Sequence, residues 1–328
     1  MNSITTQPKP TCDLCGAPGE TVQAGIADPD GKLPGEWSFR RCSDPECGVY
    51  WLDPALPRGE LWKAYTSYHT HAGKAGSKLA HSVLSLAHRW VRFCWWPVWL
   101  VSGLKREADY LRYMTLGAEP VGRLLDVGCG AGRFLHRMQR RGWQVEGIDF
   151  DEQAAAKVTR KYGIKAHVGS LAECDIPEAS FDVVTMSQTV EHLFDPRSDL
   201  QACWRVLKPG GLLVMTTPNV DSIGAAEFGP YWRGWEPPRH LHLFSVASLA
   251  RLTRQAGFEI DEARSYSAGS AVVYRVSRTL QRGGKSSFLS ELRAFSWSYV
   301  KELTEYQAQA SRPDSGQNVL VRARKPLV

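Results

Sequence analysis

LLDVGCGAGRFL, residues 124–135, carries the strongest structural signal in this 328-residue chain. An apolar strand leads into a turn that carries Gly128, Gly130 and Gly132, and a helical pattern begins immediately afterwards. Glycines in such a turn let a ligand approach the backbone closely at the N-terminus of the helix. The nicotinamide-binding fingerprint needs glycine at the first, third and sixth positions of the turn, and the sixth position here is Arg133. The turn therefore predicts a ligand site but excludes that fingerprint.

Strand and helix patterns alternate through residues 121–328. Short apolar segments such as WQVEGID, FDVVTMS and GLLVMTTP are separated by helical stretches, which predicts a parallel sheet covered on both faces. Residues 268–316 break this rhythm, because they separate the last two strand candidates, FEIDEA and NVLVRAR. Their core, FLSELRAFSWSYVKELTEY, has the spacing of an amphipathic helix. We expect a helical insertion near the ligand cleft.

The glycine turn resembles motif I of the class I methyltransferases, which use S-adenosylmethionine. Asp-x-Gly-x-Gly-x-Gly stands at 126–132, and the resemblance extends over most of residues 121–262. FDVVTMSQTVEHLFDP is similar to the family's fourth strand with its loop, and WRVLKPGGLLVMTTPN to the following helix, turn and fifth strand. The resemblance implies an α/β fold with a doubly wound, mostly parallel, seven-stranded Rossmann-like sheet, and S-adenosylmethionine as the cofactor.

The cofactor site is expected along the ends of the first strands. Asp149 ends the second strand, where an acidic residue is expected to take the ribose hydroxyls of a nucleoside. The resemblance implies that the glycine turn wraps the amino-acid part of the cofactor and that Ser170 and Leu171 border the adenine. The predicted cofactor-binding residues are Asp126, Gly128, Cys129, Gly130, Gly132, Asp149, Phe150, Ser170, Leu171 and Gln188. The thiols of Cys129, Cys174 and Cys203 have no mutual spacing, and we assign them no chemistry.

The first 58 residues predict a small zinc-ribbon-like module. The polar N-terminus lacks the apolar core of a secretory signal, so the chain is expected in the reducing cytoplasm, where clustered cysteines are metal ligands. CDLCG at 12–16 and RCSDPECG at 41–48 give Cys-x2-Cys and Cys-x4-Cys, and two such turns make a closed tetrahedral site. The predicted ligands of one structural Zn²⁺ are Cys12, Cys15, Cys42 and Cys47.

Residues 59–120 form a connector that is helical, basic and aromatic. Its side chains include Trp90, Trp95, Trp96, Trp99, Lys78, Arg89, Arg92, Lys105 and Arg106. One reading is a lid packed on the catalytic domain, and the other is a helix at 83–104 lying on the inner face of a membrane. The apolar run at 93–101 contains Pro97 and has half the length that a membrane span requires.

Methyl transfer to oxygen or carbon also requires removal of a proton, for which histidine is the usual base. His192 stands in VEHLFDP after the fourth strand, and His240 stands in WEPPRHLHLFS after the fifth. The second stretch resembles the one that bears the proposed base in zinc-containing sugar C-methyltransferases, although this chain lacks their additional C-terminal domain. Nearby aromatic side chains, the candidates for substrate binding, are Tyr231, Trp232 and Trp235.

The whole chain resembles bacterial methyltransferases of polysaccharide and secondary-metabolite pathways. The resemblance rests on the zinc ribbon, a WLDP…YHTH connector and the catalytic domain, and it implies a small-molecule or glycan acceptor such as a sugar, a lipid-linked saccharide or a secondary metabolite. The mild net charge of +6 leaves an RNA methyltransferase as one alternative. SQTVEH replaces the Asn/Asp-Pro-Pro-aromatic motif of amino-methylating nucleic-acid enzymes, which favours a small acceptor over nucleic acid but leaves methylation of ribose or of a ring carbon open. A non-catalytic cofactor-binding scaffold is the other alternative, but it would require a broken motif I. The acceptor's identity and the oligomeric state stay open.

Overall fold

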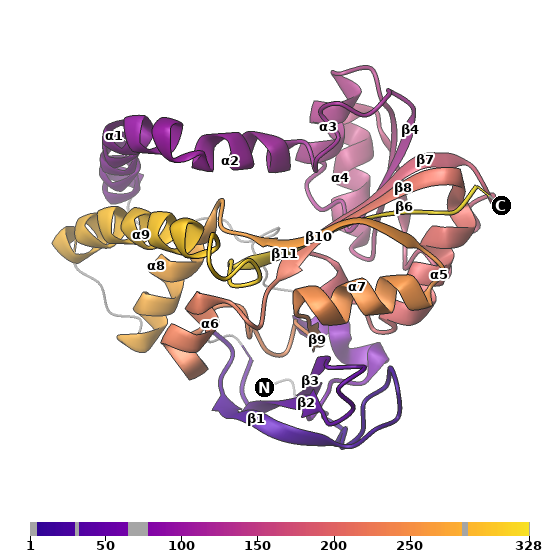
Figure 1. The fold of residues 1–328 in the computed structure, drawn as a ribbon, viewed down its shortest axis with the longest axis horizontal. Coiled ribbons are helices and arrows are strands. Elements are labelled where there is room, and N and C mark those ends of the chain that lie inside the picture. Colours follow the sequence, from indigo (N-terminus) through magenta and orange to yellow (C-terminus); the bar gives the residue numbers. More distant parts are fainter. Residues whose placement is uncertain (1–4, 30–32, 65–77, 284–287, 328) are drawn as a thin grey trace.

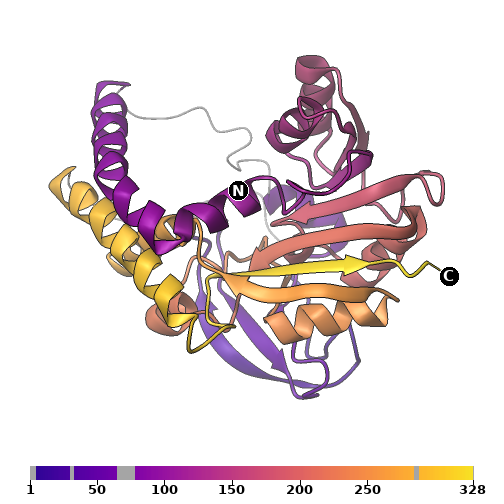
Figure 2. The same ribbon diagram turned by 45° about the horizontal axis from the view of Figure 1, so that its top comes forward.

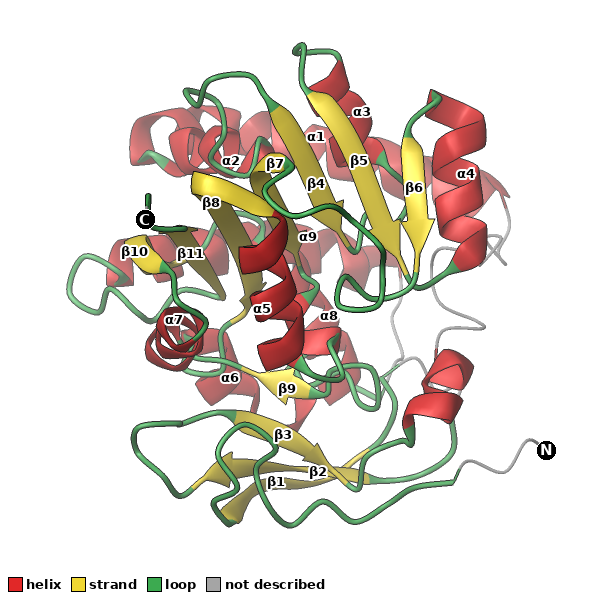
Figure 3. Cartoon of the chain, turned by 90° about the vertical axis from the view of Figure 1, so that its right-hand side faces the viewer, coloured by secondary structure: helices red, strands yellow, loops and turns green. Residues whose placement is uncertain are grey.

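The largest element of the fold is a seven-stranded sheet (Figures 1 and 3). The computed structural model describes residues 5–29, 33–64, 78–283 and 288–327. The strands of this sheet are β4 (Arg123–Val127), β5 (Gln144–Asp149), β6 (Lys165–Val168), β7 (Phe181–Ser187), β8 (Leu207–Pro218), β10 (Glu259–Tyr266) and β11 (Asn318–Arg324). Their order is β10-β11-β8-β7-β4-β5-β6; β11 pairs antiparallel with β10 and β8, and the other pairs are parallel. This topology confirms the doubly wound α/β fold predicted from the sequence.

The centre of the sheet is buried on both faces. β4 pairs in parallel with β5 and with β7, and the side chains of Leu124 and Leu125, which point to opposite faces, are both 0% exposed. Such continuous apolar strands are typical of parallel sheets covered by helices. The helices between and beside these strands are α3 (Arg133–Gln139), α4 (Glu152–Tyr162), α5 (Pro196–Val206), α6 (Ile223–Phe228) and α7 (Val246–Gln255), with short 3₁₀ turns η1 (Arg58–Ala64), η2 (Val190–His192) and η3 (Gly229–Tyr231).

A second, smaller sheet joins the N-terminal module to the catalytic part of the chain. Its strands, in spatial order, are β1 (Gly19–Ile26), β2 (Trp37–Cys42), β3 (Tyr50–Asp53) and β9 (His242–Leu243). Because β9 follows β8 in the chain and pairs antiparallel with β3, the two parts share one sheet (Figure 3). Arg239, which precedes β9, is 1% exposed and forms an ion pair with Asp28 at 2.5 Å. The N-terminal module is therefore anchored to the segment that carries His240.

Two helical regions that are far apart in the sequence pack against each other. They comprise α1 (Lys78–Ser102), α2 (Leu104–Arg112), α8 (Ser270–Gln281) and α9 (Phe288–Ala308), and α1 and α9 lie side by side in Figure 2. The imidazole of His88 stacks on Phe295 at 4.4 Å between ring centroids, and Trp99 meets Tyr299 edge-on at 5.4 Å. The helices expected at 59–120 and 268–316 thus form one unit, while the YHTH segment of the connector lies outside the described residues.

Within the described residues, no helix combines the length and the apolar character that crossing a membrane requires.

Candidate active site

A cavity of about 650 Å³ lies at the carboxyl ends of the parallel strands. Residues that follow β4, β5, β6 and β7 line it, which is where ligands bind in open α/β sheets. Its volume lies in the range of small-molecule and cofactor sites. The predicted cofactor residues that line the cavity are Gly128, Gly130, Asp149, Phe150, Ser170, Leu171 and Gln188.

The glycine turn forms one wall of the cavity. Gly128 and Gly130 have φ angles of +76° and +49°, which other residues rarely adopt. A methyl group at Gly128 would collide with Thr189, whereas a methyl group at Gly130 would meet no protein atom within 4 Å. Since Gly130 borders the cavity, the space beside its Cα is open for a ligand.

Asp149 is held at the end of β5 by the backbone around it. Its carboxylate accepts hydrogen bonds from the amides of Gly130 at 2.7 Å and Asp151 at 3.0 Å. Asp151 in turn caps α4 by accepting from the amide of Gln153. Burial raises the pKa of Asp149, and these two amide bonds oppose that rise. The carboxylate is therefore fixed in orientation beside the glycine turn.

Three predicted cofactor residues lie behind the turn and do not line the cavity. Asp126 is 4% exposed, accepts a hydrogen bond from the Thr185 hydroxyl at 2.6 Å, and has a pKa raised to about 7 by burial. The thiol of Cys129 packs toward Gly147, and the open side of Gly132 faces Val158. These residues support the shape of the turn.

The two predicted base residues lie together at the edge of the cavity. The imidazoles of His192 and His240 have centroids 4.7 Å apart, and His192 lines the cavity while His240 lies behind it. Nδ1 of His192 contacts the carbonyl of Arg239 at 3.0 Å, and Nδ1 of His240 contacts the carbonyl of Gly234 at 2.7 Å. Each ring therefore carries its proton on Nδ1, and its Nε2 is the unprotonated nitrogen.

Carboxylates surround the histidine pair. Burial lowers the pKa of His192 and, with the charge of His192, lowers that of His240 to about 3. Burial also raises the pKa of Glu191 to about 8. For Glu236, burial acts in the same upward direction, but positive charge from His240, Arg233 and Arg239 lowers its pKa to about 2. Sequence reasoning missed Glu191, although it stands directly before His192 in VEHLFDP.

The three aromatic residues proposed for substrate binding have different surroundings. Trp232 and Trp235 are 1% and 6% exposed and meet edge-on in a core cluster that also contains Phe39 of the N-terminal module. Tyr231 is 44% exposed. None of the three is among the described residues lining the cavity. The two tryptophans therefore join the module to the catalytic part.

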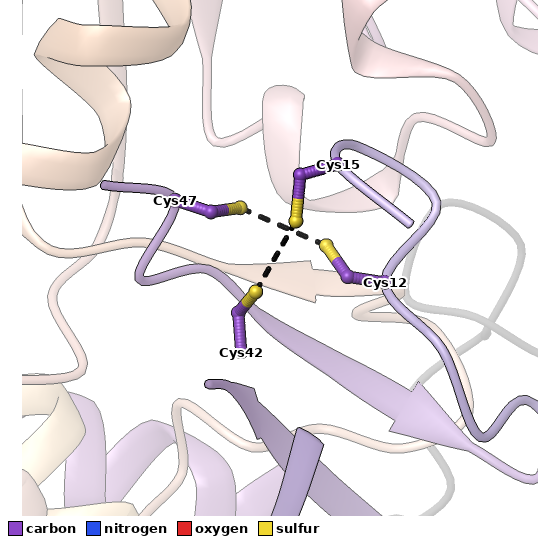
Figure 4. Close-up of side chains that lie close together, drawn as sticks. All are labelled: Cys12, Cys15, Cys42 and Cys47. Carbon is purple, nitrogen blue, oxygen red and sulfur yellow. Dashed lines mark hydrogen bonds between the residues drawn. The ribbon is translucent and has the colours of Figure 1, made fainter. Parts of the chain in front are cut away.

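The four N-terminal cysteines converge on one point (Figure 4). Their sulfur atoms lie 3.7 Å apart for Cys12 and Cys47, and 3.3 Å apart for Cys15 and Cys42. Zinc–sulfur bonds of about 2.3 Å in a tetrahedron place the sulfurs about 3.8 Å apart. The donor set and its spacing therefore fit a closed four-thiolate zinc site.

Comparison with known proteins gives the family. A family model described as a methyltransferase domain matches residues 104–263. The chain is 33% identical over 169 residues to a probable S-adenosylmethionine-dependent methyltransferase of Mycolicibacterium smegmatis, covering 49% of this chain and 64% of that protein. It is also 33% identical over 200 residues to the ubiquinone biosynthesis O-methyltransferase of Thiobacillus denitrificans, covering 54% of this chain and 81% of that one. A solved S-adenosylmethionine-dependent methyltransferase from Mesorhizobium loti aligns with a TM-score of 0.47 and 20% identity, covering 68% of this chain and all of that one.

The chain belongs to the S-adenosylmethionine-dependent methyltransferases, and its strand order is that of the class I fold. The chain spans less than two thirds of the length of the Mycolicibacterium relative.

Proposed function

We propose that the protein transfers a methyl group from S-adenosylmethionine to an oxygen or carbon atom of a small-molecule or glycan acceptor. The observation that carries this proposal is one cavity bordered by both the glycine turn with Asp149 and the imidazole of His192. Relatives named O-methyltransferases support an oxygen acceptor.

The wall of the cavity fits the cofactor. The open side of Gly130 admits a ligand against the backbone, and the fixed carboxylate of Asp149 suits a pair of ribose hydroxyls. Ser170 and Leu171 border the cavity where the adenine is expected. When bound, S-adenosylmethionine supplies a methyl group on a sulfonium, which leaves as a neutral thioether.

The protein has to align the acceptor with the methyl group and to remove a proton from the acceptor. Alignment of acceptor and methyl group provides most of the acceleration, because a sulfonium is already a good leaving group. Nε2 of His192 is placed to take the proton from an acceptor hydroxyl or carbon acid in the cavity, because Nδ1 is engaged with a backbone carbonyl. His240, in contact with His192 from behind, holds that ring in place.

The negatively charged lining of the cavity favours an acceptor that lacks a phosphate backbone. The carboxylates among the described lining residues are Asp149, Asp151, Glu173, Asp195 and Asp199. Arg58 is positively charged, but it is already engaged with Glu173. An RNA backbone gains affinity from clustered lysine and arginine, which this lining does not offer.

We further propose that Cys12, Cys15, Cys42 and Cys47 hold one structural Zn²⁺. Four thiolates leave no open coordination position, so this metal would stabilise the module and take no part in the reaction.

A membrane contact through α1 is a second proposal, and the exposed face of this helix supports it. Trp90, Phe93, Trp96, Leu100 and Val101 form this face, and Trp90 and Phe93 are 70% and 72% exposed. Arg89 and Arg92 lie beside it, which suits an anionic lipid surface. No described residue of 83–104 is among those that line the cavity, which supports the membrane contact over a lid.

The test of the methyl-transfer proposal combines binding with turnover. Calorimetry should give a low-micromolar Kd for S-adenosylmethionine, roughly −8 kcal/mol. Incubation with sugars, nucleotide-linked sugars and phenols should release S-adenosylhomocysteine with at least one hydroxylated acceptor. Binding without turnover on any acceptor would instead favour the scaffold, and turnover only on RNA would overturn the small acceptor.

A further inference from the structure

Three potential metal ligands meet at the inner edge of the cavity. They are an oxygen of Glu191 and one ring nitrogen each of His192 and His240, and all three lie within 4.8 Å of one another. The shortest approach between Glu191 Oε1 and His192 Nε2 is 4.0 Å. Two imidazoles and one carboxylate are a donor set that first-row divalent metals take, with other coordination positions left open.

Both imidazoles are oriented as metal ligands are. In metal sites, the ring nitrogen away from the metal donates its proton to a carbonyl or carboxylate, which fixes the tautomer and the ring. Nδ1 of His192 and Nδ1 of His240 each donate in this way to a backbone carbonyl, those of Arg239 and Gly234. Nε2 of each ring is thus left unprotonated, 4.0 Å from Glu191 in His192 and 3.7 Å from Glu236 in His240.

The carboxylate of Glu191 has one oxygen that the protein leaves without a hydrogen bond. The residue is 0% exposed, and its Oε2 accepts from the Thr217 hydroxyl at 2.8 Å. Its Oε1 is buried and finds no hydrogen-bond donor within the described part of the chain. A buried carboxylate oxygen without a partner is costly, and a cation is the partner that removes this cost.

The neighbouring carboxylate, Glu236, is already paired with two arginines, so Glu191 is the group that would balance a bound cation, which would hold it ionised. Glu236 forms ion pairs with Arg239 at 3.0 Å and with Arg233. It lies 3.7 Å from Nε2 of His240. A divalent ion on Glu191 and the two histidines would therefore meet a net attractive environment.

We propose that Glu191 Oε1, His192 Nε2 and His240 Nε2 form a site for one divalent first-row cation that faces the acceptor. Metal–ligand bonds of about 2.1 Å place adjacent ligands about 3.0 Å apart, so the Glu191–His192 pair has to close by about 1 Å. Because His192 lines the cavity, the open positions of the cation would face the acceptor.

This site deepens the proposed function, on which its role in the reaction rests. A cation here lowers the pKa of an acceptor hydroxyl, so the O–H bond breaks and its proton passes to water. The new O–CH₃ bond then forms as the S–CH₃ bond breaks, leaving the thioether. When the cation is bound, the two histidines are its ligands, and the cation replaces His192 as the group that activates the acceptor.

Mn²⁺ is the probe that separates this site from the four thiolates, because it prefers oxygen and nitrogen ligands to sulfur. Loss of the free Mn²⁺ signal in electron paramagnetic resonance measures binding to the zinc-loaded 328-residue chain. Wild type should bind one Mn²⁺, and Glu191→Gln and His192→Gln should each weaken binding at least tenfold. His242→Gln is the matched control, because this histidine is 1% exposed on the same segment but lies outside the cluster. Thermal melting and cofactor affinity confirm that each variant is folded. If Glu191→Gln does not fold, His192→Gln, at the less buried position, still tests the site.

Binding and turnover together separate the two proposals. Absence of Mn²⁺ binding by wild type, or undiminished binding by both cluster variants, overturns the site. Methyl transfer at full rate in metal-free buffer, with no gain on adding Mn²⁺, overturns the role of the cation and leaves the histidine base. Cluster-dependent Mn²⁺ binding without turnover on any acceptor supports the site and counts against the methyl-transfer proposal.

Discussion

Replacing Gly130 with alanine should lower the affinity for the cofactor far more than it lowers the free energy of unfolding. The glycine has a φ of +49°, and a residue with a Cβ pays about 1–2 kcal/mol in this left-handed region. No protein atom lies within 4 Å of the added methyl group, so the fold itself gains no clash. The methyl would instead project where the cofactor is proposed to lie against the backbone. Overpacking by one such group costs about 1–3 kcal/mol, which corresponds to binding weakened roughly 5- to 150-fold.

Gly163 offers a matched control for this substitution. It has a φ of +65°, ends α4, has no protein atom within 4 Å of an added Cβ, and does not line the cavity. Gly163→Ala and Gly130→Ala should therefore lower the free energy of unfolding by similar amounts, measured by urea denaturation. Only Gly130→Ala should weaken S-adenosylhomocysteine binding in calorimetry. Equal affinities for the two variants would refute the assignment of the glycine turn to the cofactor.

Three further predictions address the carboxylate, the thiolates and the surface of α1. Asp149→Asn should weaken S-adenosylmethionine binding at least tenfold in calorimetry, because a neutral amide replaces a charged acceptor whose hydrogen bonds are worth about 1.5–3 kcal/mol each. Unchanged affinity would contradict the proposed contact between Asp149 and the ribose. Cys15→Ser should lower the zinc content well below one equivalent in metal analysis, while Cys94→Ser, at an exposed cysteine outside the cluster, should not, and equal zinc in both would disprove the site. Changing Trp90, Phe93 and Trp96 together to glutamine should abolish flotation with anionic vesicles and leave the melting temperature nearly unchanged. Trp99→Ala should instead lower the melting temperature, because the contact with Tyr299 is lost. Absence of flotation by the wild-type chain would contradict the membrane proposal.

The fold was predictable because its signals are local. The glycine turn, the apolar strands and Asp149 all lie within a continuous stretch whose spacing reflects βαβ geometry. The packing of α1 on α9 was not predictable, because these helices are separated by nearly two hundred residues and α1 carries aromatic side chains around its circumference. The sequence alone therefore could not tell that Trp99 packs inward while Trp90 is exposed.

The position of the site in the sequence could be predicted, but the contacts among its side chains could not. His192 and His240 were expected near the cleft, but their proximity to each other and to Glu191 depends on the path of the segment that connects β8 of the large sheet to β9 of the small sheet. Trp232 and Trp235 precede His240 in the chain and were expected at the substrate, yet they pack in a core cluster with side chains of the small sheet, α6 and α8. Aromatic side chains have the same pattern in a sequence whether they bind a ligand or fill a core, and only the tertiary partners distinguish the two.

The pairing of β3 with β9 gives the N-terminal module a role beyond its own stability. The backbone amide of Leu52 donates to the carbonyl of Leu241, so the strand that follows His240 hydrogen-bonds along its length to the module. If the four thiolates hold the proposed zinc, its loss, through scarcity of the metal or oxidation of the sulfurs, would weaken one support of the histidine cluster. The proposed methyl transfer would then depend on the zinc supply and redox state of the cell, although the four thiolates lie outside the cavity.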